Sequence, residues 1–182
     1  MPAEQITDMK TRAPLRGAIT LRKPDRSDGA AVWELVRNCK PLDENSMYCN
    51  LLQCDHFRDT SILAEMDGAV VGWISGYMPP SSPDTLFVWQ VAVSQAARGR
   101  GLGIDMLAAL LDRKDCAGIR QLQTTITRDN AASWALFSKF SRLRGEDLTR
   151  VPYFRKDAHF DGAHDTEHMV TIPLETGARK AA

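Results

Sequence analysis

The sequence predicts an α/β domain built on a mixed sheet that is flanked by helices. Short β-rich runs alternate with segments whose apolar residues recur every three to four positions, the spacing of an amphipathic helix. A glycine-rich turn also joins the longest apolar run, residues 85–93, to the clearest helical segment, residues 104–113. The expected order is one strand, two helices, three strands, a helix, a strand, a helix, a weaker strand and a closing strand.

The first third of the chain predicts a strand followed by two helices. Residues 18–24 have the composition of a strand, which Pro24 ends. Asp28 is expected to cap a helix, and Pro41 to break it. A second helix is expected to begin near Ser46. The apolar side of the first helix consists of Ala31, Val32, Leu35 and Val36, and that of the second of Met47, Leu51, Leu52 and Cys54.

The middle of the chain predicts a hairpin and then a central strand. Residues 60–78 form two strands joined by Asp67-Gly68, a dipeptide typical of tight hairpin turns. Prolines at positions 79, 80 and 83 then force a loop. Residues 85–93 are mostly apolar, as expected for a strand in the middle of a sheet.

The second half of the chain predicts two helices, each followed by strands. Residues 104–113 form an amphipathic helix, and residues 120–127 are β-rich. Asn130 is placed to cap a helix over residues 130–140. A polar and aromatic stretch comes next, and residues 167–175 predict the closing strand. The apolar stripe of the first of these helices consists of Met106, Leu107, Leu110 and Leu111.

The composition is that of one soluble globular domain. Hydrophobic residues make up 43% of the 182 residues, and the 23 basic and 23 acidic side chains cancel, so no global field recruits nucleic acid. We expect a domain over residues 18–176 between flexible tails at residues 1–17 and 177–182. No apolar run is long enough to cross a bilayer, and the N-terminus lacks the apolar core of a signal peptide. These features predict a cytoplasmic protein with neither a membrane nor a nucleic-acid partner.

The four cysteines predict neither a disulfide nor a metal site. Cys39, Cys49, Cys54 and Cys116 contain no CxxC pair. Cys54 stands two residues before His56, which suggests a metal site, but buried thiols in a reducing compartment are the more common arrangement. We therefore expect no metal cofactor.

The stretch Arg98-Gly-Arg-Gly-Leu-Gly103 has the composition of a loop that holds phosphates. Glycines let the backbone approach an anion closely, and successive N–H groups can point into one concavity. The N-terminus of the following helix adds a partial positive charge. The loop therefore predicts a pyrophosphate site, and a glycine-rich turn without a ligand is the alternative.

Two other phosphate-binding loops fit this stretch less well. A P-loop needs Lys followed by Ser or Thr after its glycines, and that pair is missing. A dinucleotide fingerprint needs a third glycine at the position of Ile104. Its first glycine also follows the strand directly, whereas residues 94–97 separate the strand from Gly99 here. Asp129 ends the next strand and could supply the ribose-binding acid of that fingerprint. A nicotinamide-dependent enzyme is thus the weaker alternative.

The long strand, the Arg-x-x-Gly-x-Gly loop and the following helix resemble the acetyl-coenzyme A site of the GCN5-related N-acetyltransferase superfamily, and the order of elements is similar to that fold. The resemblance implies a mostly antiparallel sheet in which the fourth strand splays from the fifth and admits the pantetheine arm of acetyl-CoA. The backbone of Val91, Ala92 and Val93 would meet the pantetheine, the thioester carbonyl and the oxyanion formed from it. Asn130 would hydrogen-bond the arm. The residues that would hold the pyrophosphate are Arg98, Gly99, Arg100, Gly101, Leu102 and Gly103.

A narrower resemblance, to the diaminobutyrate acetyltransferases of ectoine biosynthesis, rests on residues 42–57, residues 86–93 and the stretch Ser-Gly-Tyr-Met-Pro-Pro before the loop. It extends over residues 21–174. It implies that acetyl-CoA acetylates the γ-amine of L-2,4-diaminobutyrate, whose product a synthase then cyclises to ectoine. It also suggests a homodimer.

A site for diaminobutyrate should offer carboxylates and an aromatic face, because this substrate carries two ammonium groups. Asp43 is expected to bind an ammonium group or to steer its deprotonation, and a helix cap or a solvated turn acid is the alternative. Tyr48 and Trp89 could line the pocket, with a core position as the alternative for each. His164 and Glu167, before the last strand, are expected to close the pocket with polar groups.

The acceptor ammonium must lose a proton before its nitrogen can attack the thioester. Asp43 or Glu167 could accept this proton, directly or through water. Many members of the superfamily use a tyrosine in the helix after the asparagine to protonate the departing thiolate, but Phe137 stands in that place and can only pack against the arm. Tyr48, Tyr153 or water would have to act instead, which leaves the general acid open.

Two alternatives to this function follow from the same residues. The acceptor could be another amine, such as a polyamine, an aminoglycoside or a protein N-terminus. The chain could also be a non-catalytic module that binds acyl-CoA, which the missing tyrosine favours.

Overall fold

The computed structural model describes residues 17–40 and 42–174, and they form a seven-stranded sheet in the order β1-β2-β3-β4-β5-β7-β6. Neighbouring strands are antiparallel except for β4 and β5, which are parallel. The strands are β1 (Ile19–Arg22), β2 (Ile62–Met66), β3 (Ala69–Tyr77), β4 (Thr85–Val93), β5 (Gln121–Thr127), β6 (Thr149–Phe154) and β7 (Glu167–Pro173). The predicted mixed sheet is confirmed.

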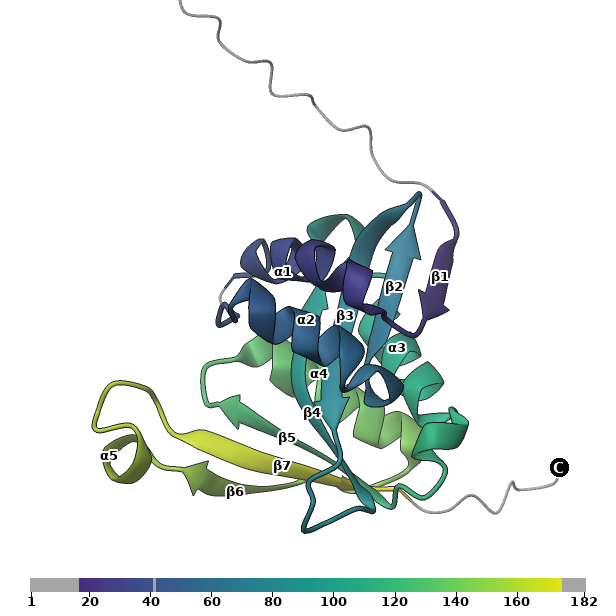
Figure 1. The fold of residues 1–182 in the computed structure, drawn as a ribbon. Coiled ribbons are helices and arrows are strands. Elements are labelled where there is room, and N and C mark those ends of the chain that lie inside the picture. Colours follow the sequence, from purple (N-terminus) through teal and green to yellow (C-terminus); the bar gives the residue numbers. More distant parts are fainter. Residues whose placement is uncertain (1–16, 41, 175–182) are drawn as a thin grey trace, which may run out of the picture.

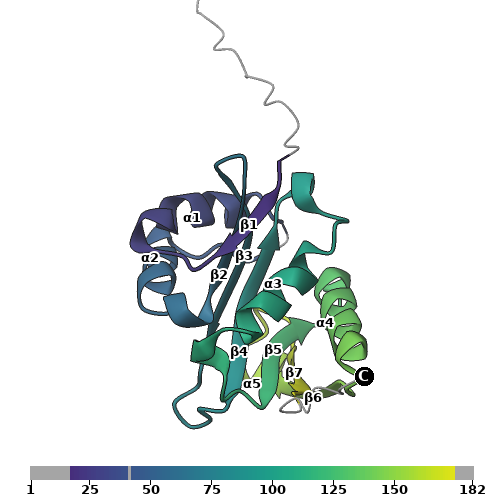
Figure 2. The ribbon, with the colours of Figure 1, turned by 90° about the vertical axis from the view of Figure 1, so that its right-hand side faces the viewer.

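Helices cover both faces of the sheet. Figure 2 shows α1 and α2 on one side and α3 and α4 on the other. The helices are α1 (Gly29–Arg37), α2 (Met47–Asp55), α3 (Leu102–Leu111), α4 (Ala131–Arg144) and the short α5 (Lys156–His159). Each layer has its own core: Trp73 of β3 points into the cluster under α1, and the next residue, Ile74, points into the cluster under α3 and α4.

A β-bulge in β4 separates the two halves of the sheet. Ser75 pairs with Gln90 and Gly76 pairs with Val88, so Trp89 is the extra residue. Beyond the bulge β4 loses its other neighbour, because its pairing with β5 covers only Thr85–Phe87. Figure 1 shows β5, β7 and β6 diverging from β4. The predicted splay between the fourth and fifth strands is confirmed.

Asp28 does not cap α1, contrary to the sequence-based expectation. It ends a single 3-10 turn that Asp25 caps, and α1 continues directly from this turn. The Asp28 carboxylate instead accepts two hydrogen bonds from Arg22, at 2.8 and 2.7 Å, which hold its pKa below the usual range. Helix α1 also ends earlier than expected, at Arg37, and Pro41 lies outside the described residues.

Helix α2 begins next to Ser46 as predicted, and the Ser46 hydroxyl caps it. This helix buries a different face from the one its apolar residues indicate. Only Cys54 of the expected set is fully buried, whereas Met47 is exposed. The buried face also contains Asn50 and Gln53, whose side chains bond one another at 2.9 Å. This bond offsets part of the cost of burying two amides, while Asn50 Oδ1 and Gln53 Nε2 remain buried without a partner.

The remaining expectations concern the chain ends, the cysteines and the membrane. Gly17, expected in a flexible tail, donates its N–H to Asp67 Oδ2 at 3.1 Å, while residues 1–16 and 177–182 lie outside the described part. All four cysteines are free, and burial raises the pKa of the Cys54 thiol to about 12. Within residues 17–40 and 42–174, no helix is long and apolar enough to cross a membrane, and no three potential ligands gather for a metal ion.

Candidate active site

The glycine loop and the free edge of β4 enclose a cavity of about 530 Å³, which we call the donor cavity. It extends from the loop to the first two turns of α4, on the side where β5 has left β4. The predicted cofactor residues that line it are Val91, Val93, Arg98, Gly99, Gly101, Leu102, Gly103 and Asn130. Lys139 of α4 and Leu42 of the loop after α1 line it as well.

The loop presents a row of unused backbone donors. Gly99 and Gly101 have φ angles of 76° and 79°, a region that favours glycine, and Gly101 leads directly into α3. Helix α3 therefore begins at Leu102, two residues earlier than predicted. The N–H groups of residues 99–103 donate to no acceptor in the described part of the chain. Successive free N–H groups at a helix N-terminus form an anion-binding concavity.

The two arginines of the loop have different positions. Arg98 donates from Nε to the carbonyl of Val93 at 3.1 Å, and its terminal nitrogens bond no described residue. Arg100 lies against Met66, with Nη1 3.6 Å from Sδ, and is not among the residues lining the donor cavity. The structure therefore places one of the two predicted arginines at this cavity.

Asn130 has the position that the sequence indicated. Its Oδ1 accepts the N–H of Ser133 at 3.1 Å and caps α4. Its amide nitrogen bonds no described residue and remains available at the cavity wall. Ala92 is not among the residues lining the donor cavity, and its side chain is buried in the cluster under α1.

A second cavity, of about 450 Å³, joins the donor cavity, and we call it the acceptor cavity. The four lining residues common to both are Leu42, Val91, Asn130 and Ser133. The structure brings four of the predicted acceptor residues to the wall of this cavity: Asp43, Trp89, His164 and Glu167. Asp43 lies in the loop after α1 and Trp89 lies in β4. His164 lies just before β7, and Glu167 is the first residue of β7.

Three of these side chains form a charged cluster. His164 Nε2 lies 3.9 Å from Asp43 Oδ2 and 3.9 Å from Glu167 Oε1. The opposite ring nitrogen, Nδ1, lies 2.7 Å from the carbonyl of Asp165, which assigns the proton to Nδ1 and leaves a lone pair on Nε2 in the neutral ring. The cluster therefore combines two carboxylates with a potential proton acceptor.

Glu167 is the most buried acid of the cluster. Its side chain is 19% exposed, and Oε2 is buried without a hydrogen-bond partner. Burial raises the pKa of the Glu167 carboxyl, against the opposing effect of His164. An acid with a raised pKa and an unpaired oxygen at a cavity wall is suited to proton transfer.

The aromatic residues correct part of the sequence interpretation. Trp89 is 47% exposed at the acceptor cavity, so the alternative of a core position is wrong. Tyr48 is 69% exposed on α2, and neither it nor Tyr153 is among the residues lining either cavity. Phe137 is buried and lines the acceptor cavity without a hydroxyl group.

Sequence reasoning missed Gln90, Asn45 and Ser133. Gln90 is 7% exposed, and its Nε2 donates to the carbonyl of Asp43 at 2.9 Å. Its Oε1 accepts from Asn45 Nδ2 at 3.3 Å, so two hydrogen bonds attach the loop that carries Asp43 to β4. The signal was present, since Gln90 is the one polar residue of the run from Leu86 to Val93. Ser133 lies one helical turn before Phe137 and gave no such signal.

The family model of the acetyltransferase (GNAT) family matches residues 29–141, more than half of the chain. The chain belongs to the GNAT acetyltransferase family. The matched region begins at α1 and ends within α4, so it contains β4, the glycine loop and most of the donor cavity. The family resemblance and the fold expected from the sequence are confirmed.

Three similar proteins are named for the same activity. The L-2,4-diaminobutyric acid acetyltransferase of Vibrio cholerae is 47% identical over 155 residues, which are 85% of this chain and 90% of that protein. The enzyme of the same name from Halomonas elongata is 43% identical over 158 residues, which are 86% of this chain and 82% of that protein. A solved structure of diaminobutyrate acetyltransferase EctA from Paenibacillus lautus contains L-2,4-diaminobutyric acid and coenzyme A. It matches with a TM-score of 0.82 and 38% identity, covering 87% of this chain and 96% of that chain.

The Gln90 bonds predict that this residue fixes the Asp43 loop in the GNAT domain. Gln90→Leu keeps the side-chain volume but removes both bonds. The amide of Leu42, which donates to the carbonyl of Cys39 at 3.1 Å beside Asp43, should then exchange its hydrogen about tenfold faster, the effect of losing roughly one hydrogen bond. Hydrogen exchange followed by mass spectrometry or NMR measures this. Gln95→Leu, at an exposed position without side-chain bonds, is the control. Unchanged exchange in Gln90→Leu would contradict the role.

Proposed function

We propose that this chain transfers the acetyl group of acetyl-CoA to the γ-amine of L-2,4-diaminobutyrate, a step in the biosynthesis of ectoine. The observation that carries the proposal is the junction of the donor cavity with an acid-lined acceptor cavity. Relatives that are 47% and 43% identical over more than four fifths of this chain bear the name of that activity. A site for an anionic thioester donor thus opens directly onto a site for a cationic acceptor.

In this proposal acetyl-CoA occupies the donor cavity as a co-substrate and supplies the activated acetyl group. The free N–H groups of residues 99–103 and the terminal nitrogens of Arg98 would hold its pyrophosphate. The unpaired edge of β4 at Val91 and Val93 would bond the pantetheine arm as a neighbouring strand does. The side-chain nitrogen of Asn130 offers a further donor to this arm.

The acceptor cavity suits a small diamine. Asp43 and Glu167 supply carboxylates for ammonium groups, and the exposed face of Trp89 can pack against one of them. Glu167 is the preferred base, because its raised pKa brings it closer to neutrality than an ordinary carboxyl. His164 Nε2 lies between the two carboxylates and can pass the proton onward to Asp43 at the open side.

Ser133 is our candidate for the group that stabilises the departing thiolate. It lines both cavities, its hydroxyl bonds no described residue, and it lies one turn of α4 before Phe137. A hydroxyl at this junction can donate a hydrogen bond to the sulfur or orient a water that does so. Tyr48 and Tyr153 lie outside the linings of both cavities and are weaker candidates.

The proposed activity predicts release of free thiol from acetyl-CoA when diaminobutyrate is added to the purified protein. A chromogenic thiol reagent measures the rate, and NMR of the product assigns the acetylated nitrogen. Ornithine and 2,3-diaminopropionate, one methylene longer and shorter, should react at least about tenfold less efficiently in kcat/KM. Preference for a polyamine or an aminoglycoside would reject the acceptor. Tight binding of acetyl-CoA without turnover of any amine would instead favour a binding module.

A second prediction concerns Glu167→Gln. Loss of the base should lower kcat about 100-fold or more, and Glu34→Gln, at an exposed position of α1, is the control. A kcat equal to that of the parent would reject the role of Glu167.

The same variant tests the raised pKa of Glu167. Because this pKa is raised in the native state, the carboxylate charge opposes folding once the pH passes the ordinary value of about 4.3. Stability therefore falls as the pH rises from that value through the raised pKa. The variant should therefore be more stable than the parent at pH 7, and the difference should vanish below pH about 4. Urea unfolding of the variant and the parent at both pH values measures this difference in stability.

A third prediction separates Ser133 from a purely structural role. Ser133→Ala should lower kcat about tenfold, the effect of one hydrogen bond to a charged group, while KM for diaminobutyrate stays unchanged. Ser138→Ala, at an exposed position of the same helix, is the matched control. Wild-type kcat in Ser133→Ala would assign protonation of the thiolate to water.

A further inference from the structure

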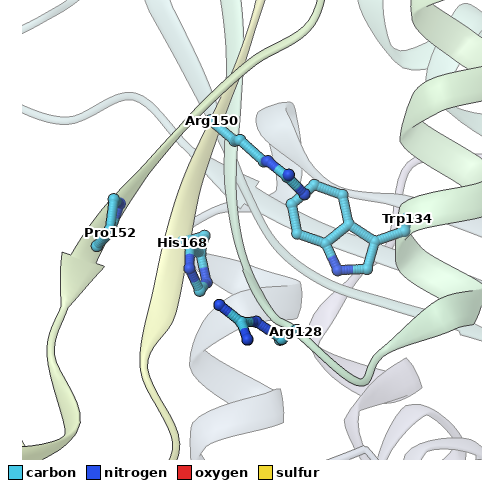
Figure 3. Close-up of a pocket in the computed structure, with 5 residues that line it drawn as sticks. All are labelled: Arg128, Trp134, Arg150, Pro152 and His168. Carbon is cyan, nitrogen blue, oxygen red and sulfur yellow. The ribbon is translucent and has the colours of Figure 1, made fainter.

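A third hollow, of about 450 Å³, lies between α4 and the strands β6 and β7, and we call it the basic groove. Its lining residues are Arg128, Trp134, Arg150, Pro152 and His168, and Figure 3 shows them around one opening. Arg128 follows β5, Trp134 lies on α4, and His168 lies on β7. Elements that are distant in sequence thus bring three basic side chains to one place.

The groove is separate from the two cavities described above. Glu167 lines the acceptor cavity, and the next residue of β7, His168, lines the groove. Successive residues of a strand point to opposite faces, so the two sites lie back to back across β7. The groove has no lining residue in common with the donor cavity. It is therefore not part of the site assigned to acetyl-CoA.

The positive charges in the groove lack counter-charges. Arg128 makes no hydrogen bond or ion pair with any residue of the described ranges. The guanidinium of Arg150 lies 5.6 Å from the centre of the Trp134 ring and likewise has no carboxylate partner there. Acidic residues are absent from the lining. Two guanidinium groups around one hollow repel each other unless an anion lies between them.

His168 adds an unused polar atom. Its Nδ1 is buried and has no hydrogen-bond partner, and Figure 3 shows the ring turned toward Arg128. Trp134 cannot fill this role, because its Nε1 already donates to the carbonyl of Thr127 at 2.9 Å. A buried nitrogen without a partner costs free energy in the native state unless a ligand or water supplies the bond.

We propose that the basic groove binds a small divalent oxyanion, with Arg128 and Arg150 as paired donors and His168 as a third. Guanidinium groups bind phosphate and carboxylate oxygens through paired N–H donors, which suits both anions. The volume exceeds that of a bare phosphate and is in the range of small-molecule sites. The shared chemistry is therefore an oxyanion, either a phosphate or the carboxylates of a small organic acid.

Site-resolved NMR titration of the full chain tests this inference without any enzymatic readout. Inorganic phosphate and succinate are added in separate arms, at ionic strength matched with chloride. We expect saturable shifts of the His168 and Arg128 resonances in at least one arm. The arm with the lower Kd identifies phosphate or carboxylate as the preferred anion. The glycine loop and the groove have no lining residue in common, so shifts at Gly99–Gly103 would report binding at the loop and shifts at His168 binding in the groove.

Two matched variants complete the experiment. Arg128→Gln and Arg150→Gln should each raise the Kd at His168 about tenfold, the effect of losing one charge-assisted hydrogen-bonded pair. Arg142→Gln, which removes an exposed charge of α4 outside the groove, should leave the Kd unchanged. Shifts confined to the glycine loop, shifts that chloride reproduces, or equal Kd values in all variants would overturn the proposal. So would His168 shifts that depend on protein concentration alone, because they would indicate a second copy in the groove.

Discussion

The extra residue in β4 is the constraint on which both cavities depend. Opposite Ser75 and Gly76, β4 contains one residue more than β3, and the bulged residue is Trp89. A bulge increases the local twist, and pairing with β5 ends at Phe87, just before it. The edge of β4 that β5 leaves unpaired forms a wall of the donor cavity, while Trp89 turns outward into the acceptor cavity. Gly76 lets β3 lie close to its neighbours at this point, since a Cβ there would lie 3.0 Å from the carbonyl oxygen of Phe87 in β4 and 2.9 Å from that of Thr60.

Each place where a ligand is proposed to bind contains at least one polar group without a protein partner. The free N–H groups of residues 99–103 lie at the donor cavity, Glu167 Oε2 at the acceptor cavity and His168 Nδ1 at the basic groove. Elsewhere the fold satisfies its buried charges, as in the Arg22–Asp28 pair. Five other buried side-chain atoms of the described residues also lack a partner and lie outside these three linings: Asn50 Oδ1, Gln53 Nε2, Trp73 Nε1, Ser75 Oγ and Ser94 Oγ. An unpaired buried atom therefore supports a binding site only where it also lines a cavity.

Local features were predictable from the sequence, and features decided by packing between distant elements were not. Ser46 and Asn130 cap helices because a short side chain meets an N–H three residues away, which local sequence determines. The same local rule predicted a cap at Asp28, but both oxygens of its carboxylate accept hydrogen bonds from Arg22 and neither caps α1. The buried face of α2 was misjudged because the hydrogen bond from Asn50 to Gln53, which offsets part of the cost of burying them, forms only after folding.

The sequence by itself determined the order of elements, the glycine loop and the family of the domain. These depend on periodicity, on residues that tolerate positive φ and on contiguous motifs, all of which are short-range properties. Only the tertiary structure decided which polar residues meet. It brought Asp43, His164 and Glu167 together across more than 100 positions of sequence and left Tyr48 outside both cavities. A side chain's neighbours across a cavity depend on strand twist and helix packing, which no local pattern encodes.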